Sequence, residues 1–183
     1  MRVKKIGLHT AHGRERVAFG RVLMWGLIFC TLLSAIPAGA ASAVVSFPDT
    51  ELEDVVRDAL DKSDGDITDS DMATLGELDA DDEEISDLSG LEYAVNLREL
   101  DLEDNEVSDL GPLINLTNLQ DLDLEDNQVS DLGPLVANSE FGSGDSVELQ
   151  FNHLDLTSGS AAMSDIEALE SRGVEVSYRP QRQ

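Results

Sequence analysis

The sequence predicts one α/β solenoid domain, right-handed, with a parallel β-sheet on its concave face and short turns or 3₁₀ helices on its convex face. Residues 97–118 and 119–140 are two copies of one 22-residue segment, and 14 of the 22 aligned positions are identical. A repeat of this length indicates a solenoid, because each unit buries its apolar face only by stacking on the next. Within each copy, leucines alternate with polar residues, as in a short strand with one buried face.

Two further repeats flank this pair. Residues 75–96 form a first repeat in the same register, with Ala80 in place of the third leucine and Glu83 in place of an asparagine. Residues 144–156 form a partial fourth repeat, which starts 25 residues after the third. The repeats therefore cover residues 75–156. Alternation along the strands predicts that the following side chains are buried: Leu78, Leu97, Leu100, Leu102, Leu119, Leu122, Leu124, Val147 and Leu149.

The repeat pattern L-x-x-L-x-L-x-x-N-x-V, followed by S-D-L-G-P-L, resembles the 22-residue leucine-rich repeats of bacterial internalins. The resemblance covers nearly all of residues 47–178. It implies a ladder in which asparagine side chains bond the backbone of neighbouring turns, and Asn105, Asn127 and Asn152 match the ladder position. Glu83 does not match it, so the ladder should be incomplete at this end. The resemblance also implies that the sheet face contacts a protein partner.

The first 43 residues have the pattern of a secretory signal peptide. A basic segment is followed by 15 uncharged residues (22–36) and then by the small-residue sites 38–40 and 41–43. The uncharged segment falls short of the roughly 20 residues that span a bilayer as a helix, which argues against a retained membrane anchor. We therefore expect cleavage after Ala43, no stable membrane insertion afterwards, and a secreted protein in the extracellular space, the periplasm or the cell envelope.

The 140 residues that remain suffice for one domain and carry an extreme charge. They contain 37 acidic and six basic residues, a net charge of −31, and no cysteine. Such a surface repels nucleic acid and anionic lipid, so neither is an expected partner. We expect a monomer without disulfide bonds.

Each end of the solenoid needs a cap that covers its exposed apolar face. Residues 44–74 should form a helical N-terminal cap, with one helix capped by Asp49 and a second that starts at a Thr68–Asp71 capping box. Residues 157–183 should form the C-terminal cap and tail. Here we expect a helix that begins at a second capping box (Ser164 with Glu167), a strand over 174–178 and a frayed tail from residue 179.

The candidate binding site is the solvent-facing side of the sheet. Alternation along the strands places three polar side chains per repeat on this side. All of them are acidic: Glu77, Asp79, Asp81, Glu99, Asp101, Glu103, Asp121, Asp123 and Glu125. None of the nine positions is aromatic, although protein interfaces favour aromatic anchors.

These acids allow two interpretations. The face binds a protein with a basic surface, or the acids adapt a structural envelope protein to high salt, which screens their repulsion. Because stacked strands lie about 4.8 Å apart, Asp79, Asp101 and Asp123 should form a column, and such a column offers oxygen ligands to Ca²⁺. Apart from that ion, no cofactor is expected. We expect no enzymatic activity, because His153 is the sole histidine after residue 43 and no nucleophile or metal-ligand spacing accompanies it.

Overall fold

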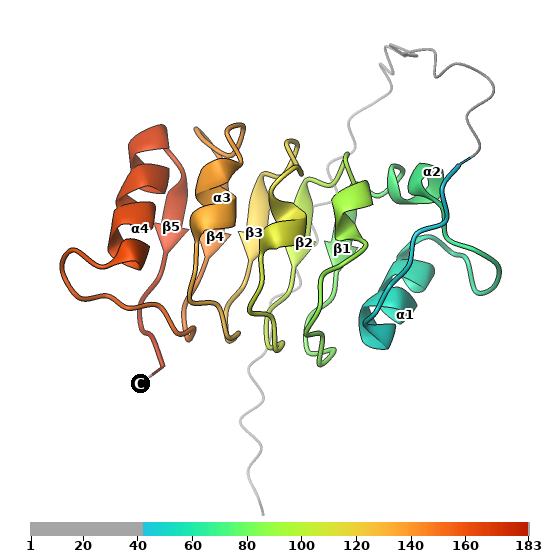
Figure 1. Ribbon diagram of the computed structural model, residues 1–183, viewed down its shortest axis with the longest axis horizontal. Helices are drawn as coiled ribbons and strands as arrows, with labels where there is room; N and C mark the ends of the chain where they lie inside the picture. The colour runs from blue at the N-terminus through green and yellow to red at the C-terminus, as the bar shows by residue number, and fades with distance from the viewer. Residues whose placement is uncertain (1–41, 183) are drawn as a thin grey trace, which may run out of the picture. The chain divides into compact units, whose positions relative to one another are not determined.

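The computed structural model describes residues 42–182, which form a five-stranded parallel sheet with helical segments along it (Figure 1). The strand order follows the chain, β1-β2-β3-β4-β5, so each repeat adds one strand beside the previous one. This is the predicted α/β solenoid. The strands are β1 (Glu77–Asp79), β2 (Glu99–Asp101), β3 (Asp121–Asp123), β4 (Ser146–Glu148) and β5 (Glu175–Ser177).

The register of the sheet reproduces the spacing of the repeats. Leu78 pairs with Leu100 and Leu100 with Leu122, a step of one 22-residue repeat each time. Leu122 then pairs with Val147, and the longer step accommodates the insertion before the fourth repeat. All nine side chains predicted to be buried are buried, with at most 3% of their surface exposed. Phe141, which lies in the insertion, is buried as well.

Three asparagines form the ladder that the repeat pattern implied. The Oδ1 atoms of Asn105, Asn127 and Asn152 each accept a backbone N–H at 2.8 Å, from Ile85, Val107 and Val129. Their Nδ2 atoms donate to the carbonyl oxygens of Ala80, Leu102 and Leu124 at 2.7, 2.6 and 2.6 Å. Each buried amide thus satisfies backbone groups that the turns of the solenoid leave unpaired.

A fourth rung of this ladder comes from the C-terminal tail. Nε2 of Gln181 donates to the Leu149 carbonyl at 2.7 Å, and its Oε1 accepts the N–H of Leu154 at 3.1 Å. These are the same positions, one repeat further on, that the asparagines bond. The N–H of Phe151 also donates to the Pro180 carbonyl at 2.7 Å. The prediction of a frayed tail is therefore wrong for residues 179–182, because they complete the last turn.

The N-terminal end is covered by α1 (Thr50–Ala59), which contacts β1, and by α2 (Asp69–Met72), which contacts the helical turn of the first repeat (Figure 1). Asp49 caps α1 as predicted, accepting the N–H of Leu52. Its second oxygen accepts the backbone N–H groups of Ser86 and Asp87. Burial acts to raise the pKa of Asp49, but these hydrogen bonds hold it below its usual value. One buried carboxylate thus joins the first helix to the first repeat.

The Thr68–Asp71 capping box is present at the start of α2. The segment before α1 is hydrogen-bonded to the start of α2. The N–H of Asp69 donates to the Ala43 carbonyl, and Val44 forms an antiparallel bridge with Thr68. Apart from its last two residues, the predicted signal peptide (1–43) lies outside the described part of the chain.

Short helical turns connect the strands on the other side of the repeats. They are the 3₁₀ turns η1 (Leu91–Tyr93) and η2 (Gly111–Leu113) and the single α-helical turn α3 (Gly133–Ala137). Asp109 and Asp131 each accept the N–H of the glycine two residues later, at 2.8 and 2.9 Å. The aspartate of each S-D-L-G-P segment thus satisfies the first N–H of the turn that follows.

The C-terminal helix α4 (Ala161–Arg172) starts four residues earlier than predicted. Ser160 is its cap and accepts the N–H of Met163, whereas Ser164 lies within the helix and donates to the Ser160 carbonyl. Gly173, with a φ of 92°, ends the helix in the left-handed conformation that glycine adopts readily. Within residues 42–182, no helix is long and apolar enough to cross a membrane.

Candidate functional site

The sheet register aligns the nine predicted acids in columns. Pairing joins Glu77, Glu99 and Asp121 in one column and Asp79, Asp101 and Asp123 in a second. The backbone hydrogen bonds of the sheet continue past the ends of the strands, where the N–H groups of Ala80 and Leu102 donate to the carbonyls of Asp101 and Asp123. This pairing aligns a third column, which consists of Asp81, Glu103 and Glu125. We call these nine residues the acidic face.

The three columns differ in exposure. Glu77, Glu99 and Asp121 are exposed, whereas Asp101, Asp123 and the whole third column are half-buried. Asp79 stays exposed at the end of the middle column, beside α1. The half-buried carboxylates of the middle and third columns therefore have less contact with water than those of the first column, which strengthens their mutual repulsion.

The middle column also has a local backbone role. Oδ1 of Asp101 accepts the N–H of Glu103 at 3.0 Å, and Oδ1 of Asp123 accepts the N–H of Glu125 at 2.8 Å. An aspartate that bonds the backbone two residues on stabilises a turn at the strand end. These contacts account for aspartate in the middle column, but they leave glutamate and aspartate at the other two columns unexplained.

Asp123 is the most strongly perturbed acid of the face. Burial, which the N–H of Glu125 only partly offsets, and the negative charges of Asp101, Glu148 and Glu103 raise its pKa to about 7. Although Asp79 as a whole residue is exposed, partial desolvation of its carboxyl group, a hydrogen bond with Asp81 and the charges of Asp81 and Asp101 raise its pKa as well. The face therefore holds more negative charge than its surroundings stabilise.

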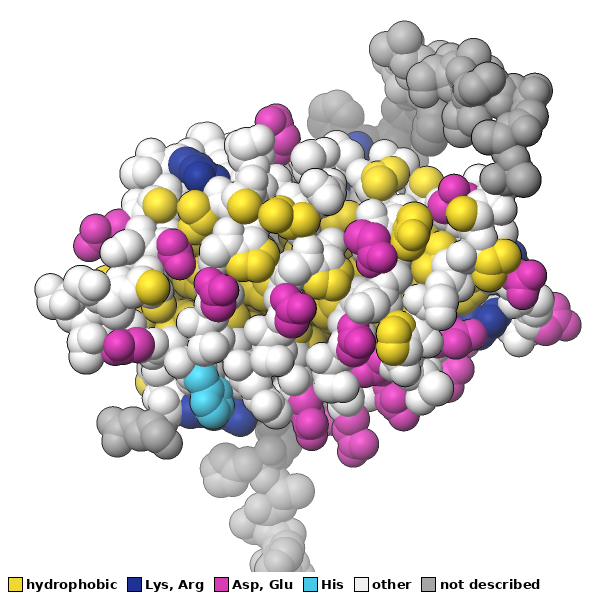
Figure 2. Space-filling view, viewed as in Figure 1, with side chains coloured by type: hydrophobic (Ala, Val, Ile, Leu, Met, Phe, Trp, Pro, Cys, Tyr) yellow, Lys and Arg dark blue, Asp and Glu magenta, His cyan; other side chains and the backbone are white. Residues whose placement is uncertain are grey.

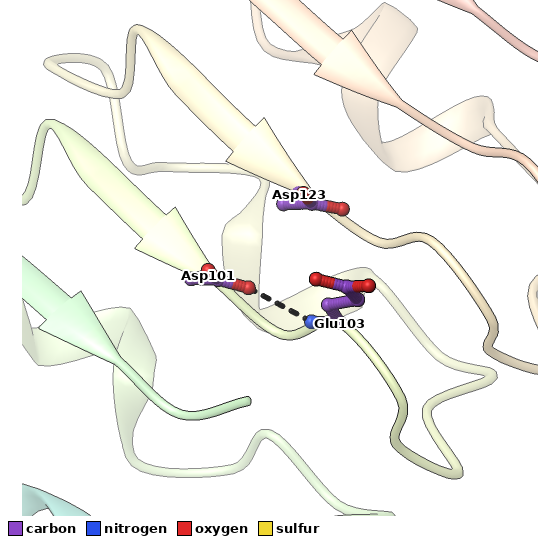
Figure 3. Close-up of side chains that lie close together, drawn as sticks. All are labelled: Asp101, Glu103 and Asp123. Atoms are coloured by element: carbon purple, nitrogen blue, oxygen red, sulfur yellow. Dashed lines mark hydrogen bonds between the residues drawn. The ribbon is translucent and has the colours of Figure 1, made fainter. Parts of the chain in front are cut away.

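Three members of the acidic face lie close enough to share one cation. Oxygen atoms of Asp101, Glu103 and Asp123 lie within 4.8 Å of one another (Figure 3). The two aspartates end β2 and β3, and Glu103 follows β2. Ca²⁺ takes oxygen ligands at 2.3–2.6 Å, so two oxygens that lie within 4.8 Å of each other can both bind one ion. Of the predicted metal-binding column, the group contains Asp101 and Asp123 but not Asp79.

Comparison with known proteins defines the fold. Residues 95–137 match the sequence family described as Leucine Rich repeats (2 copies). An internalin from Listeria monocytogenes has a similar structure, with a TM-score of 0.55 and 20% identity over 79% of this chain and 47% of that one. The chain has the leucine-rich repeat fold of the internalins. Internalin C2 of the same bacterium gives a TM-score of 0.52 and 24% identity over 78% of this chain and 72% of that one.

The chain spans about half the length of the first of these internalins. No curated protein sequence matches the chain.

The carboxyl ends of the strands carry a further row of acids, one in each of the first three leucine-rich repeats. Asp82, Asp104 and Asp126 adopt positive φ angles of 59°, 56° and 56°. Aspartate tolerates this left-handed conformation better than most residues, so local backbone geometry explains the row. In the fourth repeat the same position is Phe151, with a φ of 54°. Sequence reasoning missed this contrast, because it treated the fourth repeat as only a partial copy.

The acidic face ends at the fourth leucine-rich repeat. There, Ser146, Glu148 and Gln150 take the places of Asp121, Asp123 and Glu125. Beside them, Arg182 forms an ion pair with Asp126. Two of three carboxylates are thus replaced by neutral side chains, and the last acid of the adjacent row is paired with a cation.

The helical turns of the leucine-rich repeats have a different surface. In Figure 2, apolar side chains form a band across the repeats, between separated acidic side chains. Exposed apolar residues lie in η1 and η2 or within two residues of their ends, namely Tyr93, Val95 and Ile114. Their exposed fractions are 40%, 45% and 38%.

Proposed function

We propose that this chain is a secreted leucine-rich repeat module that binds a protein with a basic surface through its acidic face. The leucine-rich repeats and the internalin-like fold support a protein-interaction module in general. The observation that carries the finer proposal is the alignment of nine carboxylates in three columns on three adjacent repeats, along β1–β3 and just past their ends. The proposal assigns the chain no catalytic activity and places it outside the cytoplasm, as a monomer.

Charge repulsion on the face gives this partner class its physical basis. Two unit charges about 5 Å apart repel by roughly 3 kcal/mol at an effective dielectric near 20. A surface of lysine and arginine side chains relieves this repulsion when it binds. Complementary charges of this kind also raise association rates and exclude acidic partners.

The experiment uses hexalysine as a defined basic probe. Glu77→Lys with Glu99→Lys reverses two exposed charges on the face. Neither side chain has a hydrogen-bond partner among the described residues, so the strand-end turns stay intact. Glu167→Lys with Glu170→Lys makes the same charge change on exposed positions of α4 and serves as the control. Fluorescence anisotropy should show a loss of about 10-fold or more in hexalysine affinity for the first variant and a much smaller loss for the control.

Equal losses in both variants would mean that net charge alone attracts the probe. In that case the interpretation as a salt-adapted surface, without a dedicated partner, would replace the proposal.

A second candidate function is cation binding. It is favoured by the group of Asp101, Glu103 and Asp123, whose oxygens lie within 4.8 Å of one another. Ca²⁺ bound there would neutralise the most crowded part of the face. Three carboxylates supply only part of the six to eight oxygens that Ca²⁺ takes, so water would complete the coordination and the affinity should be weak, in the millimolar range.

A further inference from the structure

Phe151 breaks the pattern of the row at the strand ends. The three preceding repeats have aspartate at this position, and all four residues share one left-handed backbone conformation. Aspartate suits that conformation, whereas a bulky side chain there is an outlier. The backbone alone therefore favours aspartate or asparagine in the fourth repeat too. Phenylalanine at this position needs another explanation.

Core packing does not supply that explanation in full. Phe151 keeps 38% of its surface exposed, whereas Phe141, ten residues earlier, is 1% exposed. The contact that fixes the tail beside Phe151 is made by its backbone N–H, which donates to Pro180. Any residue other than proline supplies this donor, so the aromatic ring is not needed for that bond.

The charge around Phe151 also changes. The neighbouring positions in this repeat are Gln150 and Asn152, and the preceding aspartate of the row, Asp126, is paired with Arg182. Two residues after Phe151 this repeat has His153, whereas the earlier repeats have Glu84, Glu106 and Gln128 at the equivalent position. An exposed aromatic residue thus lies in the repeat where the acidic face gives way to mostly neutral side chains, directly after Gln150, which continues the third column.

We propose that Phe151 is the apolar anchor of the acidic face, and that the face takes a basic segment that carries an aromatic or large aliphatic side chain at one end. This inference rests on the proposed function, since the basic residues of the segment would bind over β1–β3. The apolar side chain would then contact Phe151 at the carboxyl edge of the fourth repeat. Protein interfaces commonly use aromatic residues as anchors, and none of the nine positions of the acidic face is aromatic.

Three peptides test the inference: hexalysine followed by alanine, hexalysine followed by tryptophan, and tryptophan followed by hexalysine. One tryptophan peptide should bind the parent protein about 2- to 10-fold more tightly than the alanine peptide, the gain expected of one aromatic pair. Phe151→Asn, which keeps the charge and suits the left-handed backbone, should abolish this gain. It should leave the affinity for the alanine peptide unchanged, which also shows that the variant is folded. Tyr93→Asn removes a similarly exposed aromatic side chain on a helical turn and should retain the gain.

The outcomes separate this inference from the function on which it rests. If the alanine peptide does not bind, both fall. If it binds, but neither tryptophan peptide binds more tightly, or the gain survives in Phe151→Asn, the acidic face remains a binding site and the role of Phe151 is overturned. A gain lost equally in Tyr93→Asn would also overturn it.

Discussion

Replacing Asp123 by asparagine should stabilise the protein at neutral pH. The asparagine side chain keeps an oxygen that accepts the N–H of Glu125, so the turn at the end of β3 is preserved. It removes the one carboxylate of the face that burial and the charges of Asp101, Glu148 and Glu103 penalise most. The change therefore separates the charge of this residue from its structural role.

The sign of the pH dependence follows from the raised pKa. In the folded protein the pKa of Asp123 is about 7, against 3.8 for an ordinary aspartate. Between these values the folded state holds the proton and the unfolded state releases it, so stability falls as pH rises from about 4 to about 7. A difference of three pH units corresponds to about 4 kcal/mol as an upper limit. Because the half-buried carboxyl keeps some contact with water, we expect roughly 1–3 kcal/mol.

Thermal unfolding of parent and variant between pH 4.5 and 8, at low salt, measures this effect. The melting temperature of Asp123→Asn should exceed that of the parent by about 3–10 °C at pH 8, and the advantage should shrink towards pH 4.5. Asp121→Asn removes the same charge from an exposed position on the same strand and controls for net charge. An advantage of Asp123→Asn that stayed constant over this range, or was matched by Asp121→Asn, would refute the reasoning.

Three further predictions test the fold and the cation site. Leu102→Asp should unfold the domain, because Leu102 has no exposed surface and a buried unpaired charge costs several kcal/mol; a circular dichroism spectrum like that of the parent would contradict the repeat assignment. Gln181→Leu should lower the free energy of unfolding by about 1–3 kcal/mol in urea denaturation, because the backbone groups of Leu149 and Leu154 lose their partners. Gln120→Leu, at an exposed position, is the control, and a loss for Gln181→Leu no larger than for this control would show that the tail adds no rung to the ladder. Millimolar Ca²⁺ should raise the melting temperature more than NaCl of equal ionic strength, and Asp101→Asn with Asp123→Asn should abolish the difference; equal effects of the two salts would remove the cation site.

The repeat sequence predicted the sheet well, because its period sets both the strand register and the buried positions. Two elements at the C-terminal end were not predictable in the same way. Gln181 joins the amide ladder from a tail that lies outside the repeat, so no periodicity marks it. The start of α4 was misplaced because Ser164 and Glu167 match a capping box, whereas the true cap, Ser160, is followed at the third position by a methionine.

The candidate site was predictable in position but not in chemistry. Alternation along the strands predicted that the nine acids share one face of the sheet, and the strand stacking predicted the column of Asp79, Asp101 and Asp123 that the register shows. The sequence alone, however, does not distinguish an aspartate that binds a ligand from one that bonds its own backbone, as Asp101 and Asp123 do. Nor does it reveal that Asp126 and Phe151 share one backbone conformation, because that comparison needs φ angles.

The most direct test of the central claim is where a basic ligand contacts the protein. Backbone amide resonances of the ¹⁵N-labelled protein, followed during titration with hexalysine at fixed ionic strength, report the contact residue by residue. The proposed function predicts shifts concentrated at residues 77–81, 99–103 and 121–125, with much smaller shifts in α4 and the helical turns. Shifts spread evenly over all exposed acidic positions would contradict it and would show a surface that is acidic throughout but has no binding face.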